Sequence, residues 1–187
     1  DIEIGASTTD SAASKAVAIN AVAGQTGVTA QAKTELTVLA SFTSSVFPPT
    51  STDIELNGSV VNLKATNDLA AIVKGFNDAA VGDIVAEANT DGTITFSSEA
   101  GVDIKLLDKG SGTGTTAMFS TGTDIHGESI TASSGTFTAF GNLTLTSADG
   151  SPIKISGTTA DIAHLGLIQQ SEELQISGSG VSVDSLS

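Results

Sequence analysis

The sequence predicts an α+β fold, in which small antiparallel sheets and hairpins are each packed on a short amphipathic helix. The chain is expected to form two subdomains, with the second inserted in the first. Three observations lead to this expectation. Two segments have apolar residues at helical spacing, most other apolar residues alternate as in half-buried strands, and a stretch of residues recurs further along the chain.

The first predicted helix covers residues 11–22 of the 187-residue chain. Thr9 or Asp10 is the expected N-cap, and Gly24 supplies the expected stop. Residues at three- and four-residue spacing form its apolar stripe, namely Ala12, Ala16, Ile19 and Ala23. This stripe predicts a helix that buries one narrow, alanine-rich face.

The second predicted helix begins after Thr66 or Asn67, either of which can cap it. Its apolar positions follow the i, i+3, i+4, i+7 pattern of a half-buried helix, and they are Leu69, Ile72, Val73 and Phe76. Gly75 weakens the pattern, and Gly82 lies beyond the end. A weaker third candidate covers residues 159–165.

The remaining chain reads as strands and turns. Asn57-Gly58 is a two-residue hairpin turn between two alternating runs, and the turn at residues 89–92 joins two more. A further hairpin is expected around Asp149-Gly150. The expected strands are residues 29–33, 54–56, 60–63, 84–88, 94–96, 102–107, 143–145, 153–155, 174–177 and 181–183.

An internal repeat sets the predicted domain organisation. Residues 92–106 match residues 141–155 at a constant offset of 49, without a gap. The apolar positions Ile94, Phe96, Ile104 and Leu106 meet Leu143, Leu145, Ile153 and Ile155. A helix and a strand precede the matched hairpin in each copy. One copy is contiguous, over residues 52–108, whereas the other has its helix near residue 16 and its hairpin near residue 143.

Insertion explains why one copy is split. The sequence predicts a discontinuous inner subdomain of residues 1–46 plus 127–187, and an inserted outer subdomain of residues 50–126. The stiff segment Phe47-Pro48-Pro49-Thr50 is the expected boundary. A run of consecutive subdomains is the alternative.

Composition excludes several classes of function. Seven basic residues stand against 21 acidic ones, for a net charge of −14, so the electrostatic footprints of nucleic-acid binding and of attachment to anionic lipid are absent. No apolar run approaches the length of a membrane span. Because the chain has no Cys, disulfides, thiolate metal sites and cysteine nucleophiles are excluded. The first residues show neither part of a signal peptide and read as a strand.

Residues that could carry chemistry have simpler explanations. His126 and His164 could act as a general base or as metal ligands, but they lie outside any such motif and are expected on the surface. Residues 89–92 resemble the start of a calcium loop. However, Ala100 would occupy the position of the bidentate acid, so a hairpin turn is expected.

The glycine-rich run at residues 109–114 has neither Walker nor dinucleotide-loop spacing and is expected to be a flexible loop. Asn57 and Asn142 each begin an N-glycosylation pattern that a turn or a strand start explains. The acidic residues are spread singly, apart from Glu172-Glu173 on an expected turn. The sequence therefore predicts no catalytic residues, no cofactor, no metal site and no enzyme.

The repeat also carries a family resemblance. Ala18-Ile19-Asn20-Ala21, followed by residues 25–30 (Gln-Thr-Gly-Val-Thr-Ala), resembles the "IN" motif of bacterial flagellins and flagellar hook-associated proteins. In that family a hairpin follows, which residues 143–155 match. The second copy is more divergent, since Phe76-Asn77 replaces Ile-Asn and residues 82–85 (Gly-Asp-Ile-Val) replace the Thr-Gly-Val turn.

The resemblance implies the central, variable outer domains of a flagellin, a structural protein of the bacterial flagellum that serves motility. Long heptad-patterned helices are not found in this chain, so the segments that bind other flagellin subunits are expected to be missing and the isolated chain to be a monomer. The implied location is extracellular, on the filament surface, after secretion through the flagellar channel. The implied partners include neither nucleic acid nor membrane.

The 24 Ser and 25 Thr offer many acceptors for the O-glycosylation that occurs in some flagellins. Two other functions stay open at this point. One is a domain of a hook-associated or cap protein, which carries the same motif. The other is a surface adhesin-like binding module, although the chain lacks the Trp and Tyr residues that stack on sugars.

Overall fold

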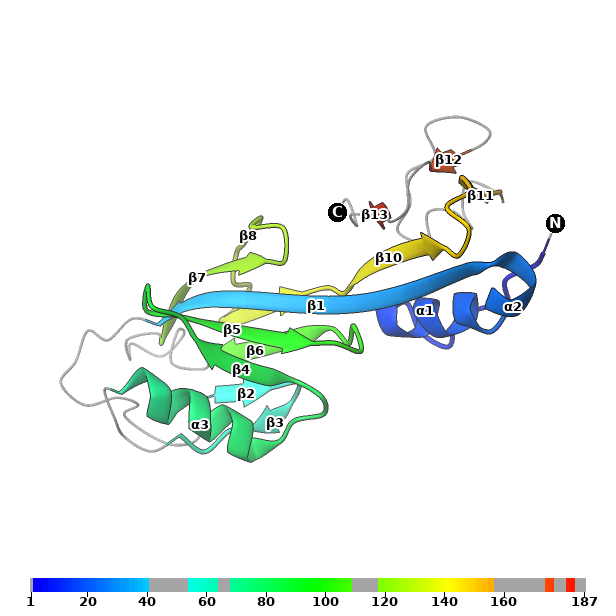
Figure 1. The fold of residues 1–187 in the computed structure, drawn as a ribbon. Helices are drawn as coiled ribbons and strands as arrows, with labels where there is room; N and C mark the ends of the chain where they lie inside the picture. Colours follow the sequence, from blue (N-terminus) through cyan, green and yellow to red (C-terminus); the bar gives the residue numbers. More distant parts are fainter. Residues whose placement is uncertain are drawn as a thin grey trace. The chain divides into compact units, whose positions relative to one another are not determined.

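A computed structural model describes residues 2–40, 54–63, 68–108, 118–156, 174–176 and 181–183 (Figure 1). Its elements, in chain order, are α1 (Ala12–Asn20), α2 (Ala23–Thr26), β1 (Val28–Ala40), β2 (Ile54–Leu56), β3 (Ser59–Val60), α3 (Leu69–Ala79), β4 (Val85–Ala88), β5 (Thr93–Ser98), β6 (Ile104–Asp108), β7 (Phe119–Asp124), β8 (Ser129–Ile130), β9 (Thr136–Ala139), β10 (Asn142–Ser147), β11 (Ile153–Ile155), β12 (Leu174–Ile176) and β13 (Val181–Val183). The fold is mixed, with few helices, and every strand pair in the described residues is antiparallel. Within those residues, no helix combines the length and the hydropathy needed to cross a membrane.

The chain divides into two compact units. Unit 1 comprises residues 1–33, 100–102 and 141–187, and unit 2 comprises residues 34–99 and 103–140. The domains expected from the sequence have other limits, at residues 46 to 50 and 126 to 127. The observed division falls inside β1, between Lys33 and Thr34.

The long strand β1 contributes its first residues to unit 1 and the remainder to unit 2. From Val28 to Lys33 it pairs with β10, and from Thr34 to Leu39 it pairs with β5 (Figure 1). The strand that follows the first helix therefore pairs edge to edge with β10, a strand that comes after Gly127 in the sequence. Sequence reasoning ended this strand at Lys33 and missed the alternation of buried residues that continues to Ala40.

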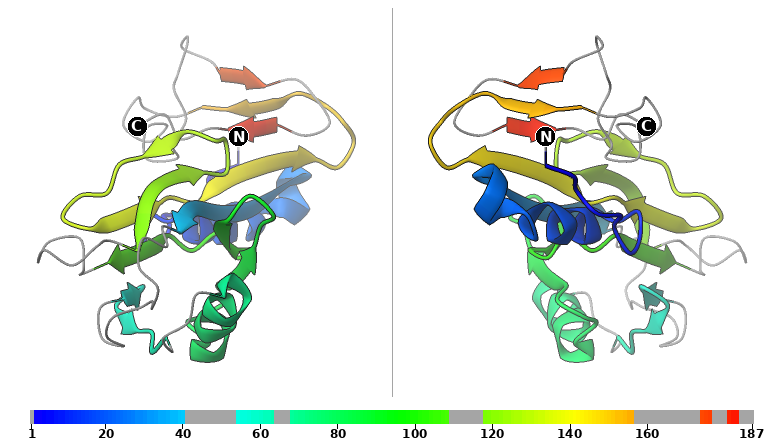
Figure 2. Two further views of the ribbon diagram at one scale, coloured as in Figure 1. Left: turned by 90° about the vertical axis from the view of Figure 1, so that its left-hand side faces the viewer. Right: turned by 90° about the vertical axis from the view of Figure 1, so that its right-hand side faces the viewer.

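Unit 1 packs α1 on strand β10, as both views in Figure 2 show. The buried face of α1 consists of Ala12, Ala16 and Ile19, which confirms most of the predicted stripe. Ser11 is the N-cap in place of Thr9 or Asp10, because its hydroxyl accepts the Ser14 backbone N–H at 3.3 Å.

The end of this helical segment also differs from the expectation. Ala23 is not part of the buried stripe, and Gly24 is not a stop, because both lie within the short helix α2. Gly27 ends α2 instead, at a left-handed φ of 70°. Glycine adopts this conformation without the steric cost that a Cβ would add, so Gly27 can turn the chain into β1.

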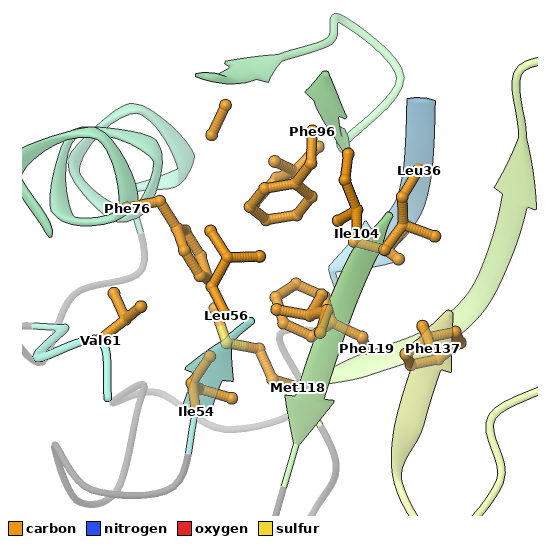
Figure 3. Packing of buried hydrophobic residues seen from close by; sticks show 14 of the residues in the cluster. Leu36, Ile54, Leu56, Val61, Phe76, Phe96, Ile104, Met118, Phe119 and Phe137 are labelled. Atoms are coloured by element: carbon orange, nitrogen blue, oxygen red, sulfur yellow. The ribbon is translucent and has the colours of Figure 1, made fainter. Parts of the chain in front are cut away.

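Unit 2 has the larger core (Figure 3). Ile72 and Phe76 of α3 are buried against a cluster that includes Phe96 and Leu106. The Phe76 and Phe96 rings meet edge to face, with centroids 4.8 Å apart and planes at 84°. The cap of α3 is Asp68, which lies next to the expected Thr66 or Asn67 and accepts the Ala70 backbone N–H at 3.0 Å.

The turns at Asn57-Gly58 and residues 89–92 are confirmed. Asn57 and Gly58 have φ values of 47° and 79°, as a type I′ turn requires, and β2 pairs with β3. Asn89 donates its backbone N–H to the Thr93 carbonyl at 2.9 Å, and β4 pairs with β5.

The hairpins predicted within residues 92–106 and 141–155 are wrong. β5 pairs with β4 and β1, whereas β6 pairs with β2 and β9. In the second copy, β10 pairs with β1 and β13, whereas β11 pairs with β12. The physical reason is that the apolar faces of β5 and β6, with Ile94, Phe96, Ile104 and Leu106, share one buried cluster instead of lying edge to edge.

Some expectations fall outside the described residues. These are the caps Thr66 and Asn67, the third helix at residues 159–165, His164, the boundary at residues 47–50, the glycine-rich run at 109–114 and Glu172-Glu173. Six apolar residues of the predicted helices and strands are all buried in the structure, and they are Ile19, Phe76, Ile94, Phe96, Leu143 and Leu145.

Candidate functional site

A helical asparagine in each unit binds the backbone of a strand that follows it. Asn20 is the last residue of α1. Its Nδ2 donates to the Ala30 carbonyl at 2.8 Å, and its Oδ1 accepts the Ala30 backbone N–H at 2.8 Å. We call this two-pronged pairing of one side chain with both backbone groups of one strand residue an asparagine clamp.

Asn77, in the last turns of α3, makes the second asparagine clamp. Its Nδ2 donates to the Ala86 carbonyl at 2.9 Å, and its Oδ1 accepts the Ala86 backbone N–H at 2.8 Å. Both clamps therefore end on an alanine of the strand after the helix. A carboxamide provides a donor and an acceptor side by side, so it can replace the neighbouring strand at one residue.

The strand register around the two clamps is the same. Ala30 lies opposite Leu145 of β10, and Ala86 lies opposite Phe96 of β5. Leu145 and Phe96 are related by the offset of 49 that the sequence repeat predicts. The two copies therefore resemble each other in structure as well as in sequence: each has the helix, the clamp, the strand pairing and the register.

Each clamp occupies the outer edge of its strand. Residues of an antiparallel pair alternately direct their N–H and C=O groups toward and away from the partner strand. Ala30 and Ala86 direct theirs to the asparagine, on the side away from β10 and β5 respectively. Unpaired strand edges can pair with other chains, and the clamp occupies such an edge at one residue.

A buried residue precedes each asparagine and holds it in place. Ile19 is 4% exposed and Phe76 is 2% exposed. The adjacent asparagine lies at the helix surface, where it can reach the strand edge. In both copies a buried apolar residue is followed directly by the asparagine of the clamp, and in unit 1 these two residues are the "IN" pair. This order therefore has a structural reason in both copies.

Three further sets of polar contacts serve turns and strand ends. The Asp108 carboxylate is buried, and its Oδ2 accepts the backbone N–H groups of Met118 at 2.6 Å and Phe119 at 3.1 Å. Ser98 donates its hydroxyl to Asp83 Oδ2 at 2.7 Å. His126 lies exposed in a turn, where its backbone N–H donates to Asp124 Oδ1 at 2.9 Å.

Two exposed turn carboxylates have lowered pKa values. The Thr93 hydroxyl, at 2.7 Å, is the main cause that holds the pKa of Asp91 below its usual range, and the Thr93 backbone N–H adds to it. The Ser151 backbone N–H is the main cause for the lowered pKa of Asp149, followed by the Ser147 hydroxyl. Both effects arise because these hydrogen bonds stabilise the charged carboxylate.

No catalytic or metal-binding residue was expected, and the described part of the chain contains no group of three His, Asp or Glu side chains that could hold a metal ion. The predicted turn and strand positions of Asn57 and Asn142 are confirmed. Sequence reasoning missed the clamp itself. The signal that could have found it is the asparagine placed directly after a buried helix residue in both copies.

Comparison of the sequence with protein-family models gives no match, and comparison with curated proteins gives none either.

Proposed function

We propose that the chain is a structural module, the surface-exposed outer domains of a flagellin that forms the bacterial flagellar filament. The observation that carries the proposal is the "IN" pair, Ile19-Asn20, followed by a clamp onto Ala30 of the next strand. The same clamp at Asn77 supports the view that this motif is a repeated building unit.

The surface composition agrees with this role. A net charge of −14 and a high content of Ser and Thr favour a solvated face. The exposed large apolar residues of the described chain include a single aromatic, Phe140. In this proposal the module performs no catalysis, and other flagellin subunits are its partners through segments outside this chain.

We further propose that the two units arose as an inner subdomain with the second copy inserted in it. The division of unit 1 into separated parts of the sequence supports insertion, as does the pairing of β1 with β10 across more than a hundred residues. Consecutive subdomains would instead place each copy in one continuous stretch.

Immunogold electron microscopy of the source cells tests the proposed function. Antibodies raised against the 187-residue chain are expected to label flagellar filaments along their whole length. Labelling confined to the filament tip or the hook junction would indicate a hook-associated protein and overturn the proposal. Labelling of the cell envelope or of non-flagellar fibres would indicate an adhesin, and it would overturn the proposal as well.

A further inference from the structure

A three-residue segment of unit 1 stands, in the sequence, between two strands of unit 2. Unit 1 includes Ala100–Val102, whereas β5 before this segment and β6 after it belong to unit 2. Both strands have buried side chains close to the segment, since Phe96 and Ile104 are 0% exposed. We call residues 100–102 the strap. The strands of unit 2 therefore fix both ends of a segment that belongs to unit 1.

The strap contacts the beginning of α1. The Ala13 backbone N–H donates to the Gly101 carbonyl at 3.2 Å. Ala13 is the second residue of α1, and the first N–H groups of a helix have no acceptor within the helix. The N-cap Ser11 accepts the Ser14 N–H and not that of Ala13. The Gly101 carbonyl therefore satisfies a donor that the helix itself cannot satisfy.

The strap also packs on β1 in the part of this strand that belongs to unit 1. A Cβ built on Gly101 would lie 2.2 Å from Ala32 Cβ and 3.0 Å from the Ala32 carbonyl carbon. A side chain does not fit there, so glycine is needed for so close an approach. Gly101 is buried, and Ala32 is 7% exposed and part of the unit 1 core. The strap therefore adds to this core at a point where the side chains are small.

The other copy of the repeat has the same turn without this contact. Gly150 corresponds to Gly101 through the offset of 49, and both residues have a φ of 73°. A Cβ on Gly150 would meet no atom of the described chain within 4 Å. The left-handed glycine is therefore common to both copies, whereas of the two positions only Gly101 has the close packing.

We propose that the strap is a stabilising element that the second copy of the repeat supplies to the first. The pairing of β5 and β6 with their neighbours holds the two ends of the strap. Gly101 is then kept where it accepts the Ala13 N–H and packs on Ala32. The stability of α1 thus depends on a segment that comes after β5 in the sequence. This inference does not depend on the flagellin proposal.

Alanine substitution of the two glycines tests the proposal. Gly101→Ala introduces a side chain at a positive φ and a clash with Ala32, whereas Gly150→Ala, the matched control, introduces the positive-φ strain alone. Amide hydrogen exchange followed by NMR reports on each part of the chain separately. The Ala13 amide is expected to exchange at least about tenfold faster in Gly101→Ala and to change by less than about twofold in Gly150→Ala.

Two strand amides of unit 2 distinguish a strap from an ordinary turn. Phe96 and Leu106 lie on β5 and β6, on either side of the strap. Their exchange in Gly101→Ala is expected to change less than that of the Ala13 amide. A change at Phe96 and Leu106 that equals or exceeds the change at Ala13 would overturn the proposal, because residue 101 would then serve the connection within unit 2. Equal exchange of the Ala13 amide in the two glycine variants would overturn it as well.

A second substitution keeps the test decisive even where Gly101→Ala does not fold. Ala32→Gly removes the Cβ that the new side chain meets, so it is expected to raise the urea midpoint of Gly101→Ala or to restore its folding. The same Ala32→Gly substitution is expected to lower the urea midpoint of Gly150→Ala, where it relieves no clash. Equal lowering of both midpoints by Ala32→Gly would overturn the proposal.

Discussion

The two copies of the repeat share the asparagine clamp and the register of one strand pair, but they differ in how their cores are filled. In unit 2 the core includes four phenylalanines, whereas the described core of unit 1 contains none and uses alanines on α1 and β1. The clamp and the strand register are nevertheless identical. The comparison teaches that the clamp and the alternation of apolar residues fix the register, while side-chain volume is free to vary.

The largest expected effect is on the free energy of unfolding, and it distinguishes a buried position of α1 from an exposed one. Ile19→Asp buries an unpaired charge in the unit 1 core and is expected to cost about 3–5 kcal/mol of unfolding free energy. Val17→Asp, on the same helix but at a position 70% exposed, is expected to change it by less than about 0.5 kcal/mol. Urea unfolding followed by circular dichroism measures both, and an unshifted transition for Ile19→Asp would contradict the placement of α1.

Two glycines at the same position of the repeat sharpen the comparison. Gly101 and Gly150 both have a φ of 73°. A Cβ on Gly101 would lie 2.2 Å from Ala32 Cβ, whereas a Cβ on Gly150 would meet nothing within 4 Å. Gly150→Ala should therefore cost about 1–2 kcal/mol from backbone strain alone. Gly101→Ala should cost about 1–3 kcal/mol more because of the clash.

The same urea titrations measure the destabilisation caused by each of the two glycine substitutions. Equal destabilisation by the two substitutions would show that the close approach of residue 101 to β1 is relieved at no cost.

The clamps can be broken one at a time. Asn20→Ala and Asn77→Ala each leave a strand N–H and C=O without their side-chain partner, so each is expected to cost about 1–3 kcal/mol. Asn62→Ala, at an exposed asparagine, is expected to have no comparable effect. The amide of Ala30 should exchange faster in Asn20→Ala, and that of Ala86 in Asn77→Ala, as followed by NMR.

Loss of a clamp also leaves a strand edge that can pair with a second copy of the chain. The unaltered chain is expected to be a monomer in light scattering, and the two clamp variants to show mass that rises with concentration. Faster exchange of both amides in either variant would argue against two independent clamps.

The smallest expected effects concern pH. The lowered pKa of Asp91 adds stability above the usual Asp range, and this contribution is lost as the pH falls through the lowered pKa. Thr93→Val removes the main cause and should raise the pKa of Asp91. Ser147→Ala should raise that of Asp149 less, because the Ser151 backbone N–H remains. NMR titration of the carboxyl carbons measures both, and equal shifts would contradict the assigned causes.

Sequence patterns predicted the local structure well where one residue type determines it. Asn57-Gly58 predicts its turn because few residue pairs adopt two successive positive φ values. The spacing of Ile72 and Phe76 predicts the buried face of α3. The observed N-caps lie one or two positions after the predicted ones. Thr9, Asp10 and Ser11 all carry suitable side-chain oxygens, and only the geometry selects one of them.

Strand partners were harder to predict. Alternation at Ile94 and Phe96 shows which side chains are buried, but not whether the next apolar strand lies beside them or across the core. For that reason the sequence pattern predicts a hairpin where β5 and β6 have other partners. The clamp was missed because it joins a side chain to a backbone nine or ten residues further on, and such a contact leaves no periodic signal.

The asparagine clamp makes the strand edge sensitive to slow chemical ageing of the protein. Attack of a following backbone nitrogen on an asparagine side chain expels ammonia, and hydrolysis of the resulting ring gives an acid. At Asn20 or Asn77 that acid would set a negative oxygen against the carbonyl of Ala30 or Ala86, in place of the amide that donates to it now. Loss of one side-chain nitrogen would therefore replace a hydrogen bond at the strand edge with electrostatic repulsion.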